Sequence, residues 1–209
     1  MSETLLQKNW YDGWFYARFI DSELGPRKRV LGFIDPGSTV IDVGCGTGGF
    51  ALKLAGRCKR VVGVDISSKQ IQSAQKRAIK AGVKNVEFVH GNGSDLERLS
   101  GSKFDYATCS LVIHEVPQQQ RIQILQSMKY AADIIVLFDY NTPQPADFWG
   151  FMVRTIEFFA GKEHFKNFKD FVRRGGLNPL AKESDLLIKE EKINRVKIFK
   201  TIACQKAES

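Results

Sequence analysis

The chain has 209 residues, 43% of them hydrophobic and 26% charged, a composition typical of a globular protein that buries its own core. No apolar run reaches the length of about 18 residues that predicts a transmembrane helix, and residues 1–13 lack the apolar segment of a secretory signal. The net charge of +8 is spread over the chain, which favours a basic surface over a dedicated nucleic-acid site. Four cysteines without C-x-x-C spacing argue against a disulfide framework or a metal site, and they predict a cytoplasmic protein.

Short apolar runs alternate with longer amphipathic stretches between residue 38 and about residue 140. The predicted strands are Ser38–Val43, Arg60–Asp65, Asn85–His90, Phe104–Ser110 and Ile134–Asp139. The predicted helices are Gly49–Arg57, Ser68–Ala81 and Gln118–Ala131. Because such alternation implies right-handed crossovers, the pattern predicts a parallel sheet with helices on both faces.

The end of the chain departs from this alternation. Leu187–Ile193 and Val196–Gln205 are two strand-like runs, joined only by Asn194 and Arg195. A connection that short permits only an antiparallel hairpin. The predicted fold class is therefore α/β, Rossmann-like and doubly wound, with a mostly parallel seven-stranded sheet that ends in an antiparallel hairpin.

A glycine-rich turn follows the first predicted strand, in Val40–Gly49 (VIDVGCGTGG). Glycines at a strand-to-helix turn permit positive φ and let a ligand approach the backbone. Gly44, Gly46 and Gly49 also satisfy G-x-G-x-x-G, the pattern of a dinucleotide site. Asp65, at the end of the second strand, suits the ribose hydroxyls of either a dinucleotide or another nucleoside cofactor. The loop alone leaves a nicotinamide dehydrogenase open.

Asp42 favours one of these alternatives. A carboxylate just before the loop would repel the pyrophosphate of a dinucleotide, but it would attract the sulfonium and ammonium groups of S-adenosylmethionine. The loop has no lysine and no G-K-[ST], which argues against a nucleoside triphosphate. The simpler interpretation is that Asp42 only caps the following turn.

Val40–Gly48 resembles the first motif of the class I, Rossmann-like S-adenosylmethionine-dependent methyltransferases, apolar–acid–apolar–Gly-x-Gly-x-Gly. Val62–Ser67, Phe88–Asp95 and Phe104–Pro117 resemble the second, third and fourth motifs in the same order. The fourth is similar to that of members acting on small molecules, including the quinone-biosynthesis group. It lacks the Asn/Asp-Pro-Pro-aromatic of enzymes that methylate amino groups on nucleobases.

The resemblance implies a set of cofactor-binding residues. They are Tyr16, Arg27, Asp42, Gly44, Cys45, Gly46, Asp65, Ile66, Asn92, Gly93, Ser94, Ser110 and Leu111. Asp65 would hold the ribose, and Ile66 would pack on the adenine. The family usually has an acid where this chain has Asn92, so either Asn92 or Asp95 would accept a hydrogen bond from the adenine amino group.

The whole chain is predicted to be one methyltransferase domain. Its parts are an N-terminal helical cap (1–37), a cofactor-binding core (38–140), a helical lid insertion (141–186) and the terminal hairpin (187–205). The cap and the lid are rich in aromatic residues, which we expect to pack against the sheet. Ligands of open α/β sheets bind at the carboxyl ends of the strands, and these two segments can cover that edge.

The predicted function is methyl transfer from S-adenosylmethionine to a small molecule by a monomer or homodimer, with S-adenosylhomocysteine as product. A catalytic base is needed only if the acceptor must lose a proton, and His114 and His164 are the candidates. Alternatively, His114 is a helix-start residue satisfied by backbone, and His164 is an exposed lid residue. An RNA or protein acceptor, motivated by the +8 charge, and a non-catalytic cofactor-binding domain are the other hypotheses. No metal ligands are predicted.

Overall fold

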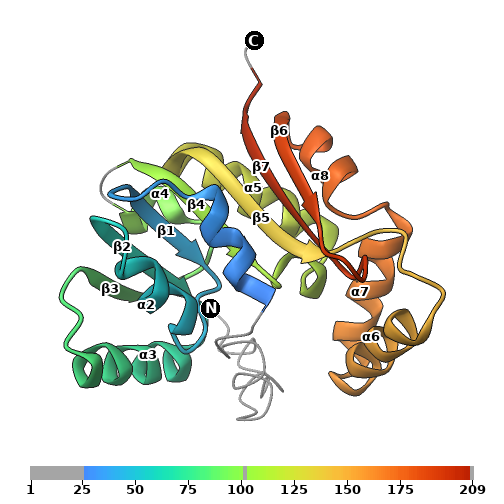
Figure 1. The fold of residues 1–209 in the computed structure, drawn as a ribbon, viewed down its shortest axis with the longest axis horizontal. Coiled ribbons are helices and arrows are strands. Elements are labelled where there is room, and N and C mark those ends of the chain that lie inside the picture. Colours follow the sequence, from blue (N-terminus) through green and yellow to red (C-terminus); the bar gives the residue numbers. More distant parts are fainter. Residues whose placement is uncertain (1–25, 101–102, 208–209) are drawn as a thin grey trace, which may run out of the picture.

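The computed structural model describes residues 26–100 and 103–207, which contain a seven-stranded sheet (Figure 1). The strands are β1 (Thr39–Val43), β2 (Arg60–Asp65), β3 (Val86–His90), β4 (Phe104–Ser110), β5 (Ala132–Tyr140), β6 (Leu186–Ile193) and β7 (Phe199–Lys206). Their order is β3-β2-β1-β4-β5-β7-β6. The first five run parallel, whereas β7 is antiparallel to both β5 and β6. The predicted fold class is confirmed.

Helices cover both faces of the sheet, and each face has its own apolar core. On one face lie the 3-10 helix η2 (Pro26–Phe33), α2 (Gly49–Ala55) and α3 (Ser68–Ala81). On the other lie α4 (Leu96–Ser100), α5 (Gln118–Ala131) and α8 (Leu177–Glu183). Among the helices described, none has the length and apolar character that crossing a membrane requires.

Local sequence explains where these elements begin and end. In β1 the side chains of Val40, Ile41 and Val43 are all buried, as expected for a strand covered on both faces. Helix α3 begins after Ser67, whose hydroxyl accepts a hydrogen bond from the Gln70 N–H, and ends at Gly82 with a φ of 66°.

The terminal hairpin is confirmed, but its predicted two-residue turn is wrong. Strand β7 begins at Phe199 and not at Val196, so the connection runs over residues 194–198. The Asn194 side chain accepts from the Phe199 N–H at 2.9 Å, and Lys197 has a φ of 55°. The left-handed Lys197 and the acceptor side chain of Asn194 therefore close a five-residue turn. The alternation of apolar and polar residues in the sequence gives no information about such a turn.

Three elements lie beyond the carboxyl ends of β4 and β5: the 3-10 helix η3 (Ile113–Glu115), α6 (Phe148–Phe159) and α7 (Lys162–Arg173) (Figure 1). Helix α6 begins after Asp147, which caps it by accepting from the N–H groups of Trp149 and Gly150. Because α7 contacts both α6 and η3, these elements form one layer at the end of the sheet.

Candidate cofactor and acceptor site

The glycine loop after β1 adopts the backbone that its sequence predicts. Gly44, Gly46 and Gly48 have φ values of 72°, 54° and 77°, a region that L side chains rarely adopt. A Cβ on Gly44 would lie 2.4 Å from Val112 Cγ2, whereas a Cβ on Gly46 would meet nothing within 4 Å. Gly44 is therefore required by packing, while Gly46 borders open space that a ligand can enter.

Asp65 lies beside this loop at the end of β2. Its carboxylate accepts hydrogen bonds from the N–H groups of Gly46 and Ser67, both at 2.8 Å. A carboxylate has about four lone-pair positions, so ribose hydroxyls could share it with the backbone. The next residue, Ile66, is 64% exposed and presents an apolar side chain at the same edge of the sheet.

Asp42 is buried in β1, two residues before the loop. Its Oδ1 accepts a hydrogen bond from Thr108 Oγ1 at 2.7 Å, across the β1–β4 pairing. This places a carboxyl group directly beneath the turn, and in its ionised form the group would make the base of the loop negative.

Two further loops complete the edge. After β3, the Asn92 side-chain oxygen accepts from the Ser94 N–H at 3.0 Å, and a Cβ on Gly93 would lie 2.5 Å from Val43 Cγ1. After β4, Ser110 is buried and Leu111 has a φ of 59°, with its N–H donated to the Phe138 carbonyl. Left-handed non-glycine residues of this kind cluster at functional sites.

A second set of polar side chains lies at the ends of β4 and β5. His114 in η3 is fully buried, and its Nδ1 lies 2.7 Å from Asp139 Oδ1 while its backbone N–H donates to Asp139 Oδ2. Glu157 from α6 accepts from the Tyr140 hydroxyl at 2.6 Å, and it is also hydrogen-bonded to His164 of α7. His114 and His164 thus face one cluster.

Electrostatics in this cluster favour the charged forms. Burial lowers the pKa of His114, but the carboxylates of Asp139, Glu157 and Glu115 outweigh it and raise that pKa to about 9. Burial raises the pKa of Glu157, but His164 and His114 more than compensate and hold it below its usual value. His114 is therefore more than the backbone-satisfied residue of the simpler interpretation, because its ring pairs with a carboxylate.

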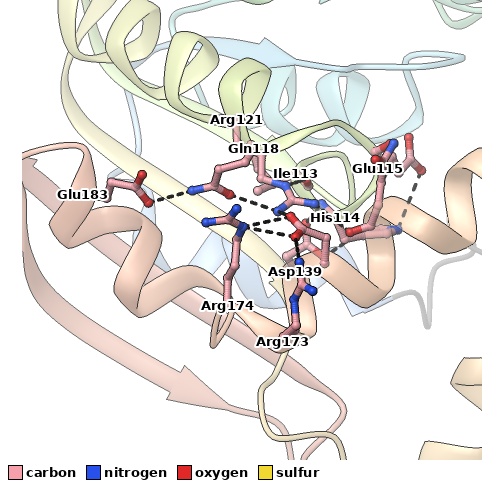
Figure 2. A network of polar contacts seen from close by, with 11 residues as sticks. Ile113, His114, Glu115, Gln118, Arg121, Asp139, Arg173, Arg174 and Glu183 are labelled. Atoms are coloured by element: carbon pink, nitrogen blue, oxygen red, sulfur yellow. Dashed lines mark hydrogen bonds and ion pairs between the residues drawn. The ribbon is translucent and has the colours of Figure 1, made fainter.

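Arg121 of α5 joins η3 to α7, as Figure 2 shows. Its buried guanidinium donates to the carbonyls of Ile113 and Asn167 and to the Asp170 carboxylate at 2.9 Å. Asp170 also pairs with Arg173 and Arg174, and Asn167 donates to the Glu115 carbonyl. These contacts fix His114 and Glu115 relative to the helix that carries His164.

Comparison with known proteins assigns the chain to a protein family. A family model described as a methyltransferase domain matches residues 34–144, which include the glycine loop and Asp65. The chain belongs to this methyltransferase family. The family expected from the sequence motifs is thereby confirmed.

Curated relatives of this chain include demethylmenaquinone methyltransferases. Those of Bacillus cereus (strain B4264) and Bacillus anthracis (strain A0248) are each 29% identical over 158 residues, which cover 69% of this chain and 65% of the relative. The chain therefore spans about 65% of the length of these relatives.

Solved structures share the fold. The PH0226 protein from Pyrococcus horikoshii OT3 has a TM-score of 0.65 at 20% identity, covering 95% of this chain and 94% of its own. Magnesium protoporphyrin IX methyltransferase from Synechocystis PCC 6803, crystallised with bound S-adenosylhomocysteine, has a TM-score of 0.61 at 20% identity, covering 85% and 78%.

The structure places eleven of the thirteen predicted cofactor residues at the carboxyl ends of β1 to β4. Tyr16 and the side chain of Arg27 lie outside the described residues, so their assignment stays a prediction. The expectation that His164 is exposed is wrong, because it packs against η3 and is 7% exposed. Sequence reasoning also missed Glu157, although a lone acid in the apolar run FWGFMVRTIEFF was a usable signal.

Proposed function

We propose that this protein transfers the methyl group of S-adenosylmethionine to a small-molecule acceptor and releases S-adenosylhomocysteine. The observation that carries the proposal is the open face of Gly46 beside the Asp65 carboxylate, with the buried carboxyl group of Asp42 at the base of the same loop. This site offers backbone and negative charge, which suit a sulfonium nucleoside and disfavour a diphosphate. Family membership and the bound S-adenosylhomocysteine of the Synechocystis relative support it.

In this proposal each loop holds one part of the cofactor. Asp65 accepts hydrogen bonds from the ribose, Ile66 packs on the adenine, and the turn at Asn92–Ser94 borders the adenine edge. Gly44–Gly46 line the methionine end, and Ser110 and Leu111 lie nearest the sulfur. During transfer the bond from sulfur to the methyl carbon breaks while the acceptor's bond to that carbon forms, and the sulfonium becomes neutral. The protein contributes mainly by aligning these three centres and excluding water.

The acceptor that we propose has an apolar, aromatic body, such as a quinol. Support comes from the names of the curated relatives and from α6, where Phe148, Phe151 and Phe158 are exposed in the described part of the chain. If the acceptor must lose a proton, the pair His114–Asp139 is the candidate base, since Asp139 fixes the ring orientation, and it would act only in the metal-free protein once His114 has lost its own proton, at a pH near its pKa of about 9. The four cysteines are buried thiols, which supports the cytoplasm as the location.

A turnover assay tests the function. Purified protein is incubated with S-adenosylmethionine and a demethylated quinol, and S-adenosylhomocysteine and methylated product are quantified. We expect equal amounts of both products, and loss of both in Gly46→Val, where a side chain fills the open face. Release of S-adenosylhomocysteine only with an RNA or protein acceptor would replace the small-molecule proposal, and absence of turnover with every acceptor would favour a non-catalytic cofactor-binding domain.

A further inference from the structure

Four side chains from three elements converge beyond the ends of β4 and β5: His114 and Glu115 of η3, Glu157 of α6 and His164 of α7. Potential ligand atoms of His114, Glu115 and His164 lie within 4.8 Å of one another. Glu157 contacts both imidazoles, since its Oε2 lies 3.6 Å from His114 Nε2 and is hydrogen-bonded to His164 Nε2. This cluster combines two imidazoles and two carboxylates.

The orientation of His114 is the most informative feature of the cluster. Asp139 engages Nδ1, so Nε2 points toward the two glutamates. Nε2 is fully buried, yet it makes no hydrogen bond to any of the described residues. Buried polar atoms almost always have a hydrogen-bond partner, whereas this ring nitrogen only approaches two carboxylates, at 3.6 and 3.9 Å, which leaves a position between them that a ligand can occupy.

Distances within the cluster are close to those of a metal site. Zinc binds histidine nitrogen and carboxylate oxygen at about 2.0–2.2 Å in tetrahedral geometry, which separates neighbouring ligand atoms by roughly 3.3 Å. His114 Nε2 lies 3.6 Å from Glu157 Oε2 and 3.9 Å from Glu115 Oε1. A contraction of a few tenths of an ångström would bring these two pairs to that spacing, while the ligand atoms of His114, Glu115 and His164, which lie within 4.8 Å of one another, would have to approach by up to about 1.5 Å.

The surroundings also match what metal ligands require. Metal-binding histidines usually donate their other ring N–H to a carboxylate, which is the role that Asp139 has here. Glu157 is in turn held by the Tyr140 hydroxyl, and the Arg121 contacts hold η3 against α7. Two carboxylates, Glu157 and Glu115, lie beside Nε2 and a third, Asp139, lies at the opposite ring nitrogen, and this concentration of negative charge favours a cation over a water molecule.

We propose that His114, His164 and Glu115, with Glu157 as a fourth ligand or a hydrogen-bond partner, bind a divalent first-row transition-metal ion of the zinc class. Imidazole nitrogen selects such ions over Mg²⁺, which prefers oxygen ligands. The ion would tie α6 and α7 to the ends of β4 and β5. The proposal rests on side chains other than those of the glycine loop, and it does not depend on methyl transfer.

Calorimetric titration with Zn²⁺ tests this site on full-length protein stripped of metal by a chelator. We expect one equivalent to bind with a Kd of about 1 µM or lower, and Mg²⁺ at the same concentration to give no binding. Glu115→Gln, at a partly exposed position where misfolding is not expected, should weaken Zn²⁺ at least about 10-fold, and His164→Asn about 100-fold. His90→Asn is the matched control, because His90 is the remaining histidine and lies on β3, with its ring bonded to the Ile66 carbonyl.

Co²⁺ provides a second measurement that needs no variant. Four-coordinate Co²⁺ bound to the wild-type protein should give visible absorption bands, and Zn²⁺ should displace them. The proposal is overturned if wild-type protein binds neither ion, if Mg²⁺ binds as well as Zn²⁺, or if Glu115→Gln and His164→Asn bind Zn²⁺ as the His90→Asn control does. S-adenosylhomocysteine binding, measured on the same samples, reports on the glycine loop alone and separates a failure of this proposal from a failure of the proposed function.

Discussion

The candidate site has two halves, one at the ends of β1 to β3 and one at the ends of β4 and β5, and they differ in the chemical groups that they present. At the ends of β1 to β3 the site consists of glycines, backbone groups and two acidic side chains, Asp42, which bonds to Thr108, and Asp65, which bonds to two N–H groups. At the ends of β4 and β5 it consists of buried ionisable side chains, His114, Glu157 and His164, brought together by separate elements. The first half is suited to binding one cofactor through backbone groups, and the second is suited to binding a cation or transferring a proton.

This difference leads to distinct sensitivities. Changes in the glycine half should act mainly on cofactor affinity or local backbone strain. Changes in the charged half should act mainly on stability, because a buried charge that loses its partner is costly. Four substitutions, from the largest expected effect to the smallest, test whether the halves can be separated in this way.

Glu157→Gln should give the largest loss of stability. The carboxylate is 1% exposed and contacts His114, His164 and Tyr140, and breaking a buried ion pair costs roughly 3–5 kcal/mol. Urea unfolding measures the loss, and calorimetry on the folded protein should show S-adenosylhomocysteine affinity unchanged. Glu163→Gln is the control, since this carboxylate is exposed and its contact to Lys166 is 3.5 Å. Unchanged stability together with lost cofactor affinity in Glu157→Gln would show that the halves are not separate.

Gly44→Ala should destabilise the fold more than Gly46→Ala. Both substitutions place a side chain at positive φ, which costs about 1–2 kcal/mol. Only the Gly44 Cβ also meets Val112 Cγ2, at 2.4 Å, which adds about 1–3 kcal/mol of overpacking. Urea unfolding compares the two, with Gly37→Ala as a control at positive φ in open space. Equal losses at positions 44 and 46 would contradict the packing role of Gly44.

Asp65→Asn should weaken S-adenosylhomocysteine binding by about 10- to 150-fold, since hydrogen bonds to a charged group contribute roughly 1.5–3 kcal/mol. Calorimetry measures the effect. Asp133→Asn removes an exposed carboxylate paired with Lys103, and it should bind like the wild type. If the Asp65→Asn protein binds S-adenosylhomocysteine with wild-type affinity, Asp65 does not accept hydrogen bonds from the ribose hydroxyls.

Ile66→Ala should have the smallest effect, a three- to tenfold loss of affinity, because one partly exposed apolar side chain contributes on the order of 1 kcal/mol when a ligand covers it. Stability should not change, since the side chain is 64% exposed. Ile79→Ala, on the outer face of α3 and 80% exposed, is the matched control. If both variants bind S-adenosylhomocysteine equally well, Ile66 does not pack on the cofactor.

The two halves also differ in how far the sequence predicts them. Gly44, Gly46 and Asp65 lie in short contiguous patterns next to their strands, so local rules of backbone conformation were enough to bring them together. The charged cluster depends on contacts between residues far apart in the chain, such as Glu157 with His114 and Arg121 with Asp170. No periodicity encodes which helix face meets which strand end, so His164 was expected at the surface and Glu157 was not identified. The prediction of a two-residue turn at Asn194 was wrong for a related reason. Lys197 adopts a left-handed conformation, and a glycine or asparagine at that position would have indicated the longer turn.

The most direct test of the central claim is a pair of calorimetric titrations on one preparation of the full chain, with S-adenosylhomocysteine and with NAD⁺. We expect S-adenosylhomocysteine, which carries no phosphate and keeps the α-ammonium group, to bind at one site and NAD⁺ to give no measurable heat, because the Asp42 carboxyl group at the base of the glycine loop attracts an ammonium group and repels a diphosphate. Binding of NAD⁺ with no binding of S-adenosylhomocysteine would contradict this.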